Sequence, residues 1–229
     1  LWPTNADIHF HCGGVLLELG QNADALKHFD IAVGVRPKWS DAHNNRSAAL
    51  SRMGRIEEAV AAAHAAVEHG PNYAALANLC AAYSSMGENA KALEYGEQSV
   101  RLSEANNPMA LINYGVALRA VWRLAEAAGA QERAIQVSQE RDYMAWSNLG
   151  AIRNLQGRNH EALAVTQRAV ELNPTNAAIQ GNMVMFGDLL AETTLLEALC
   201  RRRRVGMVQI RVTPFHEANR LERRRRGRM

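Results

Sequence analysis

The sequence predicts an all-α fold, a solenoid built from one repeated helix-turn-helix hairpin. Asparagine recurs along the 229 residues at separations of 33, 35, 35 and 34 residues, and the chain aligns with itself at about the same spacing. A repeat of that length with helical patterning is typical of stacked helix pairs. The hydrophobic fraction of 48% leans on Ala and Leu, and aromatic residues make up 6%, which favours helices over a β-sandwich.

Five complete hairpin units and one partial or capping unit are expected in residues 1–200. The units begin near Ala6, Ser40, Tyr73, Pro108 and Tyr143, and the partial unit begins near Ala177. The partial unit has Val184 at the small packing position and Ala191 at the turn position, so it departs from the others. Residues 201–229 are expected to form an Arg-rich, disordered tail.

Small residues predict where the two helices of each unit meet. The first helices carry them at Gly13, Ser47, Cys80, Gly115 and Gly150. The second helices carry alanine at Ala25, Ala59, Ala92, Ala127 and Ala162. A large side chain at either position would overpack the crossing, so both sets indicate close approach of two helices.

Glycine and proline predict the turns that separate the helices. The turn glycines are Gly20, Gly54, Gly87 and Gly157, and the prolines that close units are Pro37, Pro71 and Pro174. Glycine enters the left-handed conformation of a helix end without a Cβ penalty, and proline cannot continue a helix. Unit four has Trp122 in place of the turn glycine, and units three and four lack the closing proline, so we expect longer or reshaped connections there.

The fifth unit identifies a family resemblance. It contains AWSNLG followed by QGRNHEALAVTQRAVELNP. The residues that match the tetratricopeptide repeat (TPR) pattern are Trp146, Leu149, Gly150, Ala162, Ala169 and Pro174. The chain resembles a TPR protein over about 200 of its 229 residues. The resemblance implies a right-handed superhelix and a non-catalytic scaffold for protein–protein interaction.

The recurring asparagines are the candidate binding site. They are Asn45, Asn78, Asn113, Asn148 and Asn182, and the first unit has His11 at this position. Each lies two residues before the small packing position, about 200° away around the first helix. That side faces the concave groove in the family's superhelix, so the resemblance implies that the five amides line one inner surface. A primary amide offers donors and an acceptor that match an extended peptide backbone, which makes a protein or extended peptide the expected partner.

Two other interpretations of these asparagines stay open. Asn is frequent at this position in TPRs, where it can simply bond to solvent or to neighbouring helices. A similar row also runs through the superhelix of the O-linked N-acetylglucosamine transferases, so the chain resembles the substrate-recognition region of such an enzyme without its catalytic domain. The lack of an initiator Met leads us to expect a fragment or a processed form.

A carboxylate clamp of the kind that binds chaperone tails is not expected. Such repeats add Lys or Arg one helical turn before the asparagine, to pair with carboxylates. The residues found there are Asp7, Asp41, Ala74, Met109, Met144 and Ala178. None is basic, and the series predicts a groove that changes from acidic to apolar.

No pattern in the sequence indicates catalysis, a cofactor or a metal site, so the chain is not expected to be an enzyme. His9 and His11 are two residues apart, which places them on different faces of a helix. No Gly-rich phosphate loop and no nucleophile elbow occurs. Cys12, Cys80 and Cys200 are expected to be buried thiols in a reducing, cytoplasmic setting. No apolar run is long enough to predict a membrane span.

Charge separates the array from the tail. Residues 1–200 carry 15 Lys or Arg and 21 Asp or Glu, whereas residues 201–229 carry 11 Arg, no Lys and 2 Glu. Two arginine blocks, 201–204 and 223–226, predict binding of nucleic acid or anionic lipid as an alternative function. A solvated tail, a tail folded back on the acidic array, or a displaced reading frame would explain them equally. Exposed terminal repeats also predict possible self-association.

Overall fold

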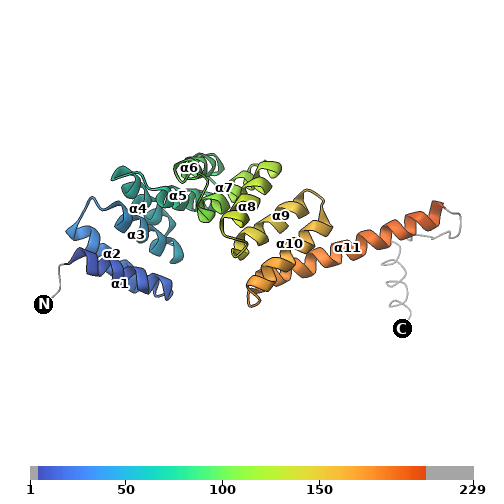
Figure 1. Ribbon diagram of the computed structural model, residues 1–229, viewed down its shortest axis with the longest axis horizontal. Coiled ribbons are helices and arrows are strands. Elements are labelled where there is room, and N and C mark those ends of the chain that lie inside the picture. Colours follow the sequence, from blue (N-terminus) through green and yellow to red (C-terminus); the bar gives the residue numbers. More distant parts are fainter. Residues whose placement is uncertain (1–4, 205–229) are drawn as a thin grey trace, which may run out of the picture. The chain divides into compact units, whose positions relative to one another are not determined.

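The structure is a computed structural model that describes the backbone of residues 5–204 and their side chains except those of Thr193 and residues 196–204. The chain divides into two compact units, Leu1–Phe186 and Gly187–Met229. Across residues 5–204 there are eleven α-helices and no strand, which confirms the predicted all-α solenoid (Figure 1). The second arginine block, 223–226, lies outside the described residues.

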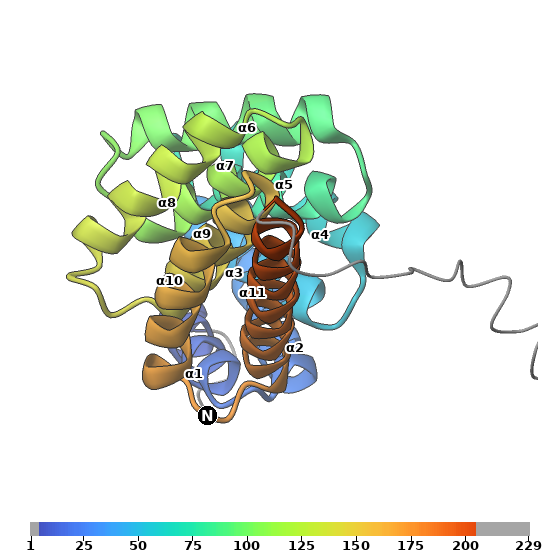
Figure 2. The ribbon, with the colours of Figure 1, turned by 90° about the vertical axis from the view of Figure 1, so that its right-hand side faces the viewer.

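Ten helices form five consecutive hairpins. They are α1 (Ala6–Glu18) with α2 (Asn22–Val35), α3 (Ser40–Arg52) with α4 (Ile56–Glu68), α5 (Tyr73–Ser85) with α6 (Asn89–Leu102), α7 (Pro108–Ala120) with α8 (Leu124–Val137), and α9 (Tyr143–Leu155) with α10 (Asn159–Leu172). Figures 1 and 2 both show the two helices of a hairpin lying side by side. Neighbouring first helices also touch, as α5 does α7.

The crossing within each hairpin is fitted by complementary side-chain sizes. A Cβ added to Gly13 would lie 2.7 Å from the ring of Phe29, and one added to Gly150 would lie 2.1 Å from Oγ1 of Thr166. The third hairpin reverses the arrangement, because there the glycine, Gly96, is on the second helix and faces the sulfur of Cys80. The first-helix positions are therefore small for the predicted steric reason.

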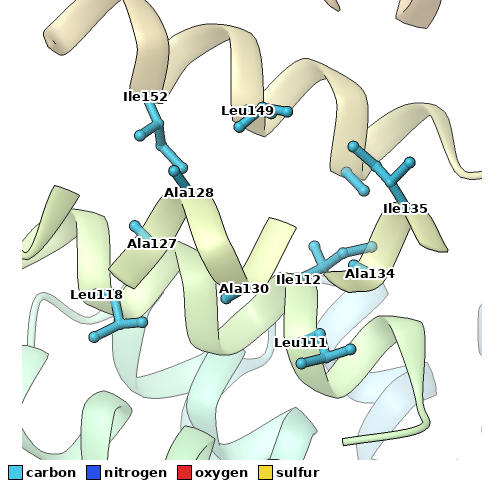
Figure 3. Packing of buried hydrophobic residues seen from close by; sticks show 11 residues of the cluster. Leu111, Ile112, Leu118, Ala127, Ala128, Ala130, Ala134, Ile135, Leu149 and Ile152 are labelled. Atoms are coloured by element: carbon cyan, nitrogen blue, oxygen red, sulfur yellow. The ribbon is translucent and has the colours of Figure 1, made fainter. Parts of the chain in front are cut away.

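The hydrophobic core runs from one hairpin into the next. One buried cluster joins Leu118 of α7, Ala127 of α8 and Ile152 of α9 (Figure 3). A second cluster draws on α2, α3 and α4, and a third on α4, α5, α6 and α7. No hairpin in the described part of the array buries its apolar side chains alone, so neighbouring repeats stabilise one another.

The turns follow the glycine pattern with one exception. Gly20, Gly54, Gly87 and Gly157 have φ angles of +75°, +75°, +76° and +74°. Trp122 adopts the same left-handed conformation, with φ +62°, although its Cβ makes that conformation costly by roughly 1–2 kcal/mol. Unit four therefore keeps the shape of the turn without glycine.

The connections that lack proline are reshaped, as expected. Residues 103–107 link α6 to α7 and residues 138–142 link α8 to α9, and each link is one residue longer than those that follow α2, α4 and α10. Each contains two successive residues with positive φ, Glu104 with Ala105 and Gln139 with Glu140.

A single helix, α11 (Ala177–Arg204), stands where a sixth hairpin would begin. Its residues Ile179 and Phe186 are buried, whereas Val184 is 59% exposed. Ala191 lies within the helix, because the position that needs a left-handed turn has no glycine. The expected end of the array at residue 200 and the disorder of the tail stay predictions.

Candidate peptide-binding surface

The five asparagines, which we call the asparagine ladder, share one register. Each is the sixth residue of its helix: Asn45 in α3, Asn78 in α5, Asn113 in α7, Asn148 in α9 and Asn182 in α11. All five are half-buried. They differ in what their amide groups bind.

Asn113 is fixed by the preceding repeat. Its Nδ2 donates a hydrogen bond to the main-chain oxygen of Ala77, at 3.0 Å. A carbonyl oxygen only accepts, so the amide nitrogen must face Ala77 and the amide oxygen must point elsewhere. No side chain or main-chain group of the described residues donates to Oδ1 of Asn113, which leaves a positioned acceptor.

Asn78 is held in a similar way by α3. Its Nδ2 donates to Oδ1 of Asn44 at 3.0 Å and lies 3.5 Å from the main-chain oxygen of the same residue. Nδ2 of Asn44 in turn donates to Oδ1 of Asn45, at 3.2 Å. Oδ1 of Asn78 has no donor among the described residues, so Asn78 also offers an acceptor. The sequence analysis missed the role of Asn44, although it adjoins a ladder residue.

Asn148 and Asn182 form no hydrogen bond with any described residue. The main-chain oxygen of Ile112 is the counterpart of the Ala77 oxygen, one repeat further along. It accepts a hydrogen bond from Nε2 of Gln131 at 3.1 Å instead, and Gln131 is fully buried. Asn148 therefore keeps both its donor and its acceptor. The ladder combines amides that link helices with amides that are free.

Small side chains lie beside the ladder. The residues three positions after the four asparagines of the complete repeats are Ala48, Ala81, Val116 and Ala151, all half-buried. Between α5 and α7 they leave a hollow of about 310 Å³, lined by Ala81, Ser84, Ser85, Asn113 and Val116. A chain segment can therefore approach the amide of Asn113 without displacing a bulky side chain.

The residues one turn before the ladder differ in how free they are. Asp7 accepts two hydrogen bonds from Arg36, at 2.8 and 2.6 Å, and Asp41 accepts one from Nδ2 of Asn72 at 3.2 Å. Met109 is 44% exposed. The acidic residues are thus already engaged within the protein, while the apolar end remains available.

The polar groups outside the ladder show no arrangement for chemistry. Within residues 5–204, no three His, Cys, Asp or Glu side chains with known positions are grouped to hold a metal ion. His9 and His28 place their Nδ1 atoms 2.9 Å apart, which joins α1 to α2. Cys12 is exposed, so its predicted burial is wrong, whereas Cys80 is buried and burial raises the pKa of its thiol to about 12. The side chain of Cys200 is not described. No helix in the described range is long and apolar enough to cross a membrane.

Comparison with known proteins agrees with the fold. Residues 13–74 match the family described as tetratricopeptide repeat. A TPR repeat-containing thioredoxin, TTL4 of Arabidopsis thaliana, is 39% identical over 77 residues, which are 33% of this chain and 11% of the relative. The chain thus has the TPR fold, with the family's sequence pattern in residues 13–74, and it spans a small part of that relative.

Solved structures extend the similarity over most of the chain. The Cut9–Hcn1 hetero-tetramer has a TM-score of 0.75 at 17% identity, covering 80% of this chain and 36% of that chain. The thermophilic TPR protein TTC0263 of Thermus thermophilus has a TM-score of 0.69 at 18% identity, covering 82% of this chain and 100% of that chain. YrrB, described as a TPR protein with an unusual peptide-binding site, has a TM-score of 0.55 at 18% identity, covering 78% and 91%. At these identities the likeness concerns the fold.

Proposed function

We propose that this chain is a non-catalytic scaffold that holds an extended segment of a partner protein along its first helices. The observation that carries the proposal is the asparagine ladder: half-buried amides in one register, of which several keep unpaired hydrogen-bonding atoms. Amides in a helix interior cost about 0.7 kcal/mol each relative to Ala, and binding a ligand backbone offsets that cost. The description of YrrB as a peptide-binding TPR protein supports the same interpretation by analogy.

The spacing of the helices suits an extended peptide. Packed helices lie about 8–10 Å apart, and an extended chain advances about 3.3 Å per residue. Successive ladder amides would therefore meet every third residue of the segment. At Asn78 and Asn113 the ligand must supply an N–H, because the asparagine nitrogens are already bonded within the protein. At Asn148 the ligand can supply either partner.

A phage-displayed library of random linear peptides provides the probe for this proposal. A peptide selected on the wild-type chain should lose binding when Asn78, Asn113 and Asn148 are all replaced by Ala, as measured by fluorescence polarisation. The matched control replaces Asn89 and Asn159, the first residues of two second helices, by Ala and should bind normally. Unchanged binding to the ladder variant would assign the ladder a structural role.

Two other functions remain predictions with their own tests. A catalytic domain encoded downstream of residue 200 would favour the substrate-recognition region of an O-linked N-acetylglucosamine transferase-like enzyme. Binding of nucleic acid through the arginine blocks would fall steeply with salt and would vanish on deletion of residues 201–229.

A further inference from the structure

We propose that the hollow between α5 and α7 is a subsite that selects one aliphatic side chain of the bound segment. This inference rests on the proposed function and adds what the partner must contain. The hollow is formed by α5 on one side and α7 on the other, beside Asn113. Its volume of about 310 Å³ is at the low end of the range for ligand pockets, so it suits one side chain rather than a larger group.

The lining sets the chemistry of that side chain. No charged residue lines the hollow, and Ala81 and Val116 supply apolar surface from the two helices. The hydroxyl of Ser85 donates a hydrogen bond to the main-chain oxygen of Ala81 at 3.0 Å, so its proton is already used within α5. A charged ligand side chain would lose water here without gaining a partner, which is costly. Leu, Ile, Val or Met would gain by burial.

Asn113 sets the register of the segment. Its nitrogen is bonded to the Ala77 oxygen, so the group that it presents to a ligand is Oδ1. Only a donor can bind there, and every residue of a peptide except proline carries one in its backbone N–H. The aliphatic residue in the hollow is therefore expected within a residue or two of a backbone N–H that bonds to Asn113.

The hollow is tested by the same library of random linear peptides. Selection on the wild-type chain should give sequences with an aliphatic residue at one fixed position. Ala81→Leu would fill the hollow and should weaken the selected peptide roughly ten- to hundredfold, the effect of losing one buried aliphatic side chain. Ala61→Leu makes the same change at an exposed site on α4 and should leave affinity unchanged. Circular dichroism of each variant verifies folding.

A second variant changes specificity rather than affinity. Val116→Ala enlarges the hollow, so a new selection should favour a bulkier apolar residue at the same position. If the residue preferred there is the same for wild type, Ala81→Leu and Val116→Ala, the hollow is not a subsite. Should those peptides still depend on the ladder, the proposed function stands and only the subsite fails. Selected peptides that ignore the ladder, or a library that gives no binder, would contradict the proposed function itself.

Discussion

The residues at the helix crossing show how one atom decides the packing of a hairpin. Gly150 leaves no room for a Cβ, because Oγ1 of Thr166 and the main-chain oxygen of Ala162 lie 2.1 and 3.3 Å from its position. Thr166 is β-branched and 1% exposed, so it cannot turn away easily. The equivalent pair in the second hairpin, Ser47 with Ala63, distributes the same space differently.

Replacing Gly150 by Ala should therefore lower the free energy of unfolding by about 1–3 kcal/mol, the usual cost of overpacking. Adding Thr166→Ala should recover most of that loss, since it removes the clashing atoms. Urea denaturation of the single and double variants measures both effects. Gly129→Ala is the control, because a Cβ there meets nothing within 4 Å and should stabilise α8 by about 0.5–1 kcal/mol. A loss that Thr166→Ala does not recover would refute the steric explanation.

The cysteines give a prediction about reactivity. Burial raises the pKa of Cys80 from 9.0 to about 12, so its thiolate is scarce in the folded chain, whereas Cys12 is exposed. Native protein treated with iodoacetamide at pH 9 should be alkylated at Cys12 and not at Cys80, and denatured protein at both, as read by mass spectrometry. The stability due to the protonated Cys80 thiol is complete below pH 9.0 and is lost as the pH rises toward about 12. Rapid alkylation of native Cys80 would contradict its burial.

Capping residues join the elements as well as ending them. Asn72 caps α5 by accepting a hydrogen bond from the N–H of Ala75, and its Nδ2 donates to Oγ of Ser40 and to Oδ1 of Asp41 in the repeat before. Asn107 caps α7 through the N–H of Ala110 alone. The same residue type thus supports one helix in one repeat and two helices in another.

Asn72→Ala should therefore cost more stability than Asn107→Ala, about 2 against about 1 kcal/mol, because it removes the link to α3 as well as the cap. Asn72→Asp keeps the cap acceptor but places a second carboxylate beside Asp41, so it should fall below wild type while Asn107→Asp stays close to it. Thermal or urea denaturation measures the four variants. Equal losses from the two Ala variants would show that the link to α3 contributes nothing.

At the level of elements, the sequence predicted most of what the structure contains. Small residues, turn glycines and prolines at fixed offsets predict hairpins because each meets a local steric need, and helices indeed begin at Ser40, Tyr73 and Tyr143. The left-handed conformation of Trp122 could not be predicted, because a neighbouring repeat, and not the local preference of tryptophan, decides it. The uneven hydrogen bonding of the ladder depends on Asn44 and Gln131, which come from other helices.

At the scale of the whole molecule, the array has no single centre. Three buried clusters follow one another through α1 to α9, so each repeat depends mainly on its neighbours. A binding surface that runs along the first helices is spread over the same repeats. Its affinity should therefore be the sum of several modest contacts rather than the result of one site.

Deleting residues 201–229 should leave peptide binding intact, because the ladder lies in residues 45–182. Binding of the deletion variant should also depend weakly on salt, since no charge–charge contact is part of the proposed interaction. Fluorescence polarisation at low and high ionic strength measures both. Loss of peptide binding on deletion would place the binding site in the arginine tail.

The central claim is that the ladder holds a peptide backbone, and the coupling between Asn113 and one peptide N–H tests it most directly. Peptides selected on the wild-type chain are N-methylated at one position at a time, and each is titrated against wild type and Asn113→Ala. At one position the methyl group should weaken binding to wild type by about three- to tenfold, the worth of one hydrogen bond, and have little effect on the variant. Methylation that weakens both proteins equally at every position would contradict the claim.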